Sequence, residues 1–397
     1  MRPKRWRVNI SVITIAVVSV GAIAGFSRLH DSFSKYNPKF IKERVRHVPP
    51  NRTRGNQWLK QAEAWNPYLM EDCPMLSKPW TAENFKERGQ KALEYLWAPI
   101  EWELRNWESL LDTIAAMWIN KTIAFIGDSN TEAQFTSLVC LFHVKYGTYS
   151  KLVNDNDGTQ YDSNGISMVF LRTDRIVEKT SCKSYCEGHS KIVKERLCLS
   201  KCKQTHLVTN RVSSNVISFM NRHKPDVLTI NTGAHYSRGK HGTEDLAFQL
   251  FKMAVDSTIE WLAKIDWNIV VFWRLSHINL YSNGDWNTFG NCTADKPGTN
   301  INILHPVLHK RVSEQNDYVN TKIQTLQGKE YKALVSVLDV YTLSYDRPDA
   351  MCGKMKSRNG WDCTHFCAPG VTDVWNILLL SLLRKKMKEK ERDAHLL

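Results

Sequence analysis

The chain reads IAFIGDS at residues 123–129, which places a short apolar run directly before a Gly-Asp-Ser turn. The following pattern predicts a helix over residues 131–143. A serine between a strand and a helix is exposed at a sharp turn, and its own N–H points the same way as the free N–H groups at the helix start. This arrangement favours a nucleophile whose transition state carries an oxyanion, although Gly-Asp-Ser also occurs in ordinary turns and helix caps.

Three further apolar runs, at residues 227–230, 269–273 and 334–338, each end in a polar or glycine-containing group. Continuous apolar runs of this length are typical of parallel strands that are buried on both faces. Helical segments such as residues 247–265 separate them. The pattern predicts an α/β fold, a three-layer sandwich with a mainly parallel sheet whose functional residues gather at the carboxyl ends of the strands.

A late Asp-x-x-His segment supplies the partners that a serine nucleophile needs. His365 can take the serine proton, and Asp362 can fix the tautomer of the imidazole. The spacing of three predicts that both side chains lie on one face of a helical turn. The alternative is that Asp362 caps a helix and His365 is an ordinary core or surface residue.

The N-terminus predicts a membrane anchor. Residues 8–26 contain no charged residue and are about long enough to span a bilayer, while basic residues in the preceding segment 1–7 should keep that tail cytosolic. Residues 27–70 are basic and polar without apolar periodicity, which predicts a stem before a lumenal domain at 71–397. A cleavable signal peptide is the alternative, and both send the domain into the secretory pathway.

The cysteines agree with an oxidising compartment, because their count of ten is even and allows all of them to pair. The C-x3-C spacings suit two stacked bridges, Cys182 with Cys202 and Cys186 with Cys198, or a zinc site. Three sequons could carry glycans, at Asn51, Asn120 and Asn291.

The formal charge of +14 would suit nucleic acid, anionic lipid or acidic polysaccharide. The sequence carries no zinc-finger or RNA-binding signature, so a nucleic-acid partner is not expected.

Three segments carry longer motifs. Residues 362–376 read DCTHFCAPGVTDVWN, residues 283–292 read NGDWNTFGNC, and residues 125–129 read FIGDS. Together they resemble the signatures of the plant trichome-birefringence-like proteins of the PC-esterase group. The resemblance covers roughly Cys73 to the end of the chain, and the C-terminal motif is the most specific part of it.

The resemblance implies an SGNH-hydrolase-like fold and O-acetylation of a cell-wall polysaccharide such as xylan. It implies Ser129 as nucleophile within the motif Gly127-Asp128-Ser129, with His365 as base and Asp362 as its orienter. Further implied roles are oxyanion donation by Asn231 beside the Ser129 N–H, and substrate contacts by Arg274, Asp285 and Trp286.

The resemblance also implies the surroundings of the enzyme. The co-substrate would be an activated acetyl donor, acetyl-CoA or a derived carrier, with no bound cofactor and no metal. The partners would be a polysaccharide acceptor, the Golgi membrane and an anchored protein that supplies the donor. The expected location is a single-pass type II Golgi membrane protein with a lumenal catalytic domain.

Two departures from the family pattern concern the acceptor. Glu132 stands where the family has a basic residue three positions after the serine, and Ala234-His235-Tyr236 stands where it has His-Trp-Trp. Glu132 could exclude an acidic chain, which favours a neutral glycan.

Three alternatives remain open at the sequence level. The triplet Asp155-Asn156-Asp157 suits a metal-dependent glycosyltransferase, although Gly158 after it favours a turn. Fourteen Trp and thirteen Tyr residues could serve a non-catalytic glycan-binding protein, although most should pack the core. An acetylesterase of the same fold would use the same residues and pass the acyl group to water.

Overall fold

The computed structural model describes residues 58–61, 65, 67, 72–73, 94–147, 149–155, 158–180, 207–236, 243–279, 306–326, 331, 333–345, 347–354 and 361–395. The expected tail at 1–7, the expected anchor at 8–26 and nearly all of the expected stem at 27–70 lie outside these residues. Within the described ranges, no helix is both long and apolar enough to cross a membrane.

The described elements follow one another in the order β1 Trp58–Lys60, β2 Tyr95–Trp97, η3 Ala98–Ile100, α3 Glu101–Arg105, α4 Trp107–Met117, β3 Thr122–Gly127, α5 Ser129–Tyr146, β4 Tyr149–Asp155, β5 Gly158–Ser163, β6 Ile166–Arg172, β7 Val177–Thr180, β8 Leu207–Val212, α8 Ser214–His223, β9 Val227–Ile230, α10 Glu244–Leu262, β10 Ile269–Arg274, α11 Pro306–Gln324, β11 Ala333–Leu338, α12 Val340–Ser344, η6 Pro348–Ala350, β12 Met351–Lys354, β13 Trp361–Phe366 and α13 Val371–His395.

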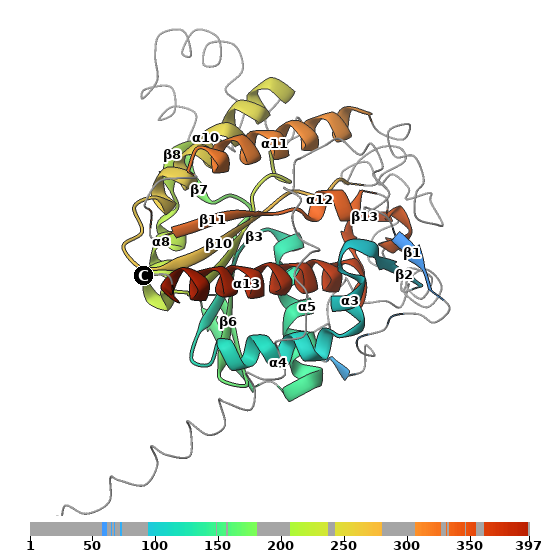
Figure 1. Cartoon of the computed structure of the whole chain (residues 1–397). Helices are drawn as coiled ribbons and strands as arrows, with labels where there is room; N and C mark the ends of the chain where they lie inside the picture. The colour runs from blue at the N-terminus through green and yellow to red at the C-terminus, as the bar shows by residue number, and fades with distance from the viewer. Residues whose placement is uncertain are drawn as a thin grey trace, which may run out of the picture. The chain divides into compact units, whose positions relative to one another are not determined.

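A seven-stranded sheet in the order β11-β10-β9-β3-β6-β5-β4 forms the centre of the fold. The strands from β11 to β6 run parallel, whereas β5 and β4 are antiparallel additions at one edge. All four apolar runs form parallel strands, so the prediction of an α/β fold with a mainly parallel sheet is confirmed. Figure 1 shows α10 and α11 on one side of this sheet, and α5 and α13 on the other.

Of the Asp-x-Asp triplet, only Asp155 lies within the described residues, at the end of β4. β4 ends at Asp155, β5 begins at Gly158, and these two residues pair in register. Gly158 has φ of 95°, a left-handed conformation that glycine adopts without strain. Asn156 and Asp157 lie outside the described residues, so the turn interpretation stays a prediction.

Helix α5 carries the predicted nucleophile at its first residue. The Asp128 side chain caps the helix by accepting the backbone N–H groups of Asn130 at 3.0 Å and Thr131 at 3.3 Å. The helix ends at Tyr146, and Gly147 follows with φ of 74°. Most of its side chains are buried, because the sheet covers one side of the helix and α13 packs against another.

A buried polar network joins α5 to the start of α13. The Ser137 hydroxyl donates to the Asp373 carboxylate at 2.5 Å, and Asn376 Nδ2 donates to the Ser137 oxygen at 2.9 Å. The other Asp373 oxygen accepts the backbone N–H of Gly370 at 2.6 Å. These bonds fix the nucleophile helix against the chain that follows His365.

The cysteine pairing differs from the expectation. Cys73 and Cys140 form a disulfide that ties the N-terminal part of the domain to α5, and Cys363 is also disulfide-bonded. Cys367 is buried and free, so the prediction that every cysteine can pair is wrong at this position. The four cysteines at 182, 186, 198 and 202 lie outside the described residues.

Candidate active site

The Ser129 turn depends on a glycine. A Cβ atom at Gly127 would lie 2.2 Å from Thr131 Oγ1 and 3.1 Å from the Asn231 carbonyl oxygen, so no side chain fits there. Asp128 then caps α5, and Ser129 starts the helix with its side chain half-buried. The free N–H groups of a helix start favour negative charge at this point.

Asp362 and His365 lie on β13, and the expected helical turn is wrong. Regular alternation along a strand would place residues three apart on opposite faces. β13 pairs with β12 through Met351 with Phe366 and through Gly353 with Asp362, so β13 has three residues between these pairs where β12 has one. This bulge turns both side chains to the same side.

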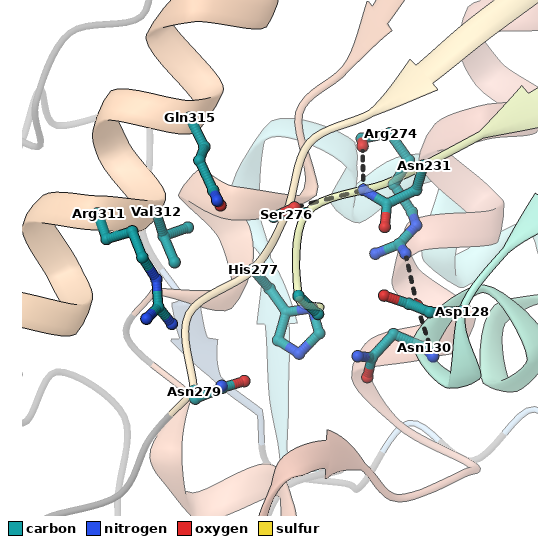
Figure 2. A pocket seen from close by; sticks show the side chains of 12 residues that line it. Asp128, Asn130, Asn231, Arg274, Ser276, His277, Asn279, Arg311, Val312 and Gln315 are labelled. Atoms are coloured by element: carbon teal, nitrogen blue, oxygen red, sulfur yellow. Dashed lines mark hydrogen bonds and ion pairs between the residues drawn. The ribbon is translucent and has the colours of Figure 1, made fainter. Parts of the chain in front are cut away.

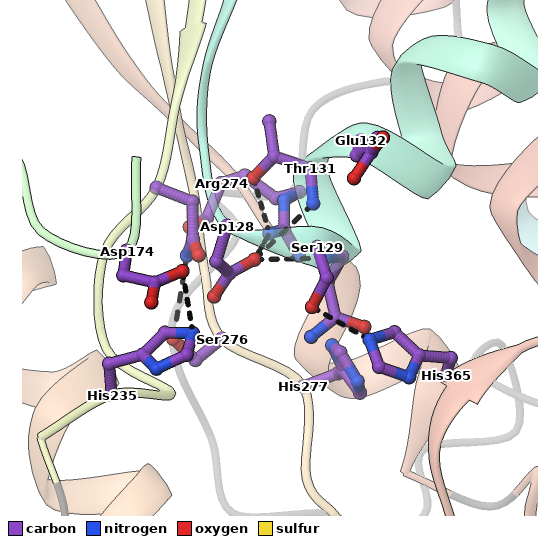
Figure 3. A network of polar contacts seen from close by, with 12 residues as sticks. Asp128, Ser129, Thr131, Glu132, Asp174, His235, Arg274, Ser276, His277 and His365 are labelled. Carbon is purple, nitrogen blue, oxygen red and sulfur yellow. Dashed lines mark hydrogen bonds and ion pairs between the residues drawn. The ribbon is translucent and has the colours of Figure 1, made fainter. Parts of the chain in front are cut away.

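The three predicted side chains form a continuous chain of hydrogen bonds, of which Figure 3 shows the bond between Ser129 and His365. His365 Nδ1 lies 2.8 Å from Asp362 Oδ2, and His365 Nε2 lies 2.7 Å from Ser129 Oγ. The ionised carboxylate can only accept, so Nδ1 carries the proton and the Nε2 lone pair faces the serine hydroxyl. This geometry suits abstraction of the Ser129 proton.

A buried ion pair between Arg274 and Asp128 lies beside the turn that carries Ser129. Arg274, at the end of β10, is 1% exposed, and its Nη2 lies 3.0 Å from Thr131 Oγ1 and 3.7 Å from Asp128 Oδ1. Its guanidinium also lies over the Trp375 ring, 5.2 Å from the centroid. Arg274 therefore joins the end of β10 to both α5 and α13.

The charges of this pair are set by burial and by each other. Burial lowers the pKa of Arg274 to about 10, against the opposing effect of Asp128, so the guanidinium stays protonated at neutral pH. Burial alone would raise the pKa of Asp128, but Arg274, with help from His235, holds that pKa below its ordinary value. Both Arg274 and Asp128 are thus ionised next to Ser129.

His277 is a second histidine beside the Ser129–His365 pair (Figure 3). Its Nε2 donates to the Thr364 carbonyl at 2.7 Å, and its ring packs against Phe366 and Trp375. Burial, followed by the charge of Arg274, lowers the pKa of His277 to about 4. The ring is therefore neutral at physiological pH and holds the backbone beside His365.

Asn231, the predicted second oxyanion donor, is buried and directly follows β9. Its Nδ2 donates to the Arg274 carbonyl at 2.7 Å and lies 3.4 Å from Ser276 Oγ. The first bond commits one amide proton. The second is long and therefore weak, and donation of this proton to an oxyanion stays a prediction.

The structure describes only some of the residues predicted to contact the substrate. Arg274 reaches the site but is buried in the contacts above, and Asp285 and Trp286 lie outside the described residues. Glu132 forms an ion pair with Arg172, and its effect on an acidic chain stays a prediction. His235 forms an ion pair with Asp174 at 3.1 Å.

Comparison with known proteins decides the family. The PC-Esterase model, described as a GDSL/SGNH-like acyl-esterase family found in Pmr5 and Cas1p, matches residues 112–382. The chain belongs to this family. The resemblance seen in the motifs, and the SGNH-like fold that it implied, are confirmed.

Several curated relatives of this PC-esterase are plant proteins. Protein trichome birefringence-like 12 of Arabidopsis thaliana is 23% identical over 380 residues, covering 88% of this chain and 89% of that protein. Protein trichome birefringence-like 14 of the same plant is 26% identical over 361 residues, covering 82% of this chain and 80% of that protein. Xyloglucan O-acetyltransferase 4 of Populus trichocarpa is 25% identical over 326 residues, covering 77% and 75%.

Several residues around this PC-esterase site carried no signal of their own in the sequence. Gln315 lies on α11, which is mostly polar, and no local motif marks it. Asp373 stood inside the C-terminal motif, but its link to Ser137 spans 236 positions. Among the described residues, no group of three or more His, Cys, Asp or Glu side chains is placed to hold a metal ion.

Proposed function

We propose that this PC-esterase is an O-acetyltransferase that moves an acetyl group to a hydroxyl of a cell-wall polysaccharide through an acetyl-Ser129 intermediate. The observation that carries the proposal is the hydrogen-bonded chain from Ser129 Oγ through His365 to Asp362. The naming of relatives as xyloglucan O-acetyltransferases supports transfer to a polysaccharide.

In the first step, His365 Nε2 takes the Ser129 proton while Oγ attacks the acetyl carbonyl of the donor. The oxyanion receives hydrogen bonds from the Ser129 N–H and from Asn231 Nδ2. The carbonyl re-forms, the donor's leaving group departs with the proton from His365, and Ser129 carries the acetyl group.

In the second step, an acceptor hydroxyl gives its proton to His365 and attacks the acetyl-Ser129 carbonyl. Collapse of the oxyanion breaks the bond to Oγ, which regains the proton from His365. Asp362 stabilises the imidazolium in both steps. An acetylesterase would run the same steps with water as the acceptor, so exclusion of water by the acceptor decides between them.

The proposed setting is the Golgi lumen. Residues 8–26 would anchor the chain as a type II membrane protein, with 27–70 as a stem. The donor would be acetyl-CoA or a derived carrier, delivered by an anchored partner protein. The apolar segment at 8–26 and the basic residues before it support this setting.

The test follows the acetyl group. The domain from residue 49 onward is incubated with p-nitrophenyl acetate and a panel of deacetylated glycans, and the protein and products are weighed. We expect acetyl-Ser129 and glycans that gain one acetyl group, both absent with Ser129→Ala. Free acetate with no modified glycan would assign the esterase reaction, and no adduct on Ser129 would remove the covalent mechanism.

A further inference from the structure

A small polar cavity adjoins the turn that carries Ser129. It has a volume of about 20 Å³, and its lining includes Asp128, Asn130, Asn231, His277 and Gln315 (Figure 2). His277 also lies beside the Ser129–His365 pair in Figure 3, so the cavity is next to the reacting hydroxyl. A space of this size holds one water-sized group.

Two buried side chains that line this cavity carry donors without hydrogen-bond partners among the described residues. Gln315 is 2% exposed, and its Nε2 has no hydrogen-bond partner among the described residues. Arg274 also lines the cavity, and its Nε and Nη1 are buried without partners in the same part of the structure. Unpaired buried donors are rare in folded proteins, so an acceptor atom of a ligand is expected between them.

The surrounding backbone keeps this space open and in place. Asn316 accepts the Ser276 N–H at 2.9 Å and donates to the Ser276 carbonyl at 2.8 Å, which fixes α11 against the chain after β10. Gly233 lines the cavity, and a Cβ atom there would lie 2.4 Å from Ser276 Oγ and 3.4 Å from Gln315 Oε1. A side chain at 233 would therefore fill the space.

We propose that this cavity binds one hydroxyl of the acceptor sugar, a neighbour of the hydroxyl that receives the acetyl group, and that Gln315 Nε2 donates a hydrogen bond to it. The inference rests on the proposed transferase function and adds a residue that selects the acetylated position. A sugar hydroxyl has the size of the cavity, and it can accept from Gln315 or Arg274 and donate to the Asp128 carboxylate.

Gln315→Leu tests the proposal, with Gln324→Leu, an exposed position at the end of α11, as the matched control. Acetylation of Ser129 by p-nitrophenyl acetate and transfer to deacetylated xyloglucan are measured separately. In Gln315→Leu, transfer should fall about tenfold more than acetylation, the cost of one hydrogen bond. The control should change neither. An unchanged ratio in Gln315→Leu overturns the proposal and leaves a structural water as the occupant.

A second measurement does not depend on the variant folding. Monodeoxy derivatives of an accepted oligosaccharide are compared with the parent in the wild-type protein. Removing the hydroxyl next to the acetylated one should lower transfer by the wild-type protein about tenfold. Gln315→Leu should show no such loss, because the deoxy acceptor and the substitution remove the same hydrogen bond. Equal rates for every deoxy acceptor overturn the proposal. A wild-type protein that never forms acetyl-Ser129 would instead refute the proposed function.

Discussion

The Asp362 carboxylate holds three N–H groups at once. It accepts the backbone N–H of Thr364 at 3.0 Å and of His365 at 3.1 Å, in addition to His365 Nδ1. The backbone bonds fix the carboxylate before it meets the imidazole. One aspartate therefore shapes the bulge of β13 and also sets the tautomer of His365.

Asp362→Asn should lower the rate of Ser129 acetylation by about three to four orders of magnitude, because an amide no longer imposes the productive tautomer of His365. The fold should persist, since the amide oxygen can still accept backbone N–H groups. Stopped-flow release of nitrophenol from p-nitrophenyl acetate measures the rate, with Asp349→Asn, a buried ion-paired aspartate outside the site, as the comparison. A rate within tenfold of wild type would remove Asp362 from the mechanism.

His277 makes stability depend on pH. Its folded pKa is about 4, below the ordinary value of 6.5, so between these values the unfolded state binds a proton that the folded state does not. The free energy of unfolding should therefore fall as the pH drops from 6.5 to 4, by up to about 3 kcal/mol from this group. The contribution of His277 to the free energy of unfolding is fully present above pH 6.5.

His277→Gln should reduce that loss, because a glutamine amide can donate to the Thr364 carbonyl without titrating. Urea unfolding at pH 7 and pH 4.5 gives the difference for each protein, and His143→Gln on α5 is the matched control. If wild type and His277→Gln lose the same free energy, His277 is not the group responsible.

Among the elements, those with local signals were predictable from sequence and those made by long-range pairing were not. The strands that end before Ser129 and at Arg274 are continuous apolar runs, and such runs indicate buried parallel strands. The bulge of β13 depends on register with β12, which no periodicity at residues 362–365 records. The cavity is likewise assembled from the start of α5, the chain at the ends of β9 and β10, and α11, so its donors at Arg274 and Gln315 meet only in the folded chain.

The link between α5 and α13 predicts coupled losses. Ser137→Ala removes the donor to Asp373 and the acceptor of Asn376, so it should cost about 1–3 kcal/mol of unfolding free energy. It should also slow Ser129 acetylation, because α5 carries Ser129 and Gly370–Asp373 follows His365. Thr258→Val on α10, which removes a buried hydroxyl bonded to the Ala254 carbonyl, is the control.

Both readouts are needed for this prediction. Urea unfolding gives the free energy of unfolding. Acetylation is measured without urea, so that an unfolded fraction of the protein does not lower the rate. Ser137→Thr keeps the hydroxyl and should recover the rate. A Ser137→Ala protein that is destabilised but acetylates Ser129 at the wild-type rate would show that the network only stabilises the fold.

At the scale of the whole molecule, the proposed lumenal location can be tested at Asn120. This residue belongs to a sequon, is exposed, and lies in the turn between α4 and β3 with φ of 61°. An oligosaccharide there would project from the end of the sheet opposite Ser129, since β3 begins after this turn and ends at the active site. Glycosylation should therefore be compatible with activity.

Expression of the full chain in plant cells should give a protein whose electrophoretic mobility changes on deglycosylation. Asn120→Gln should remove part of that change, because only a domain in the secretory lumen meets the glycosylation machinery. Thr122→Val removes the same sequon by a different residue and should give the same mobility. Asn164→Gln, at an exposed turn position with φ of 47° that lies in no sequon, is the control for the substitution itself. If no form of the chain changes mobility on deglycosylation, the lumenal location and the type II anchor at residues 8–26 are refuted together.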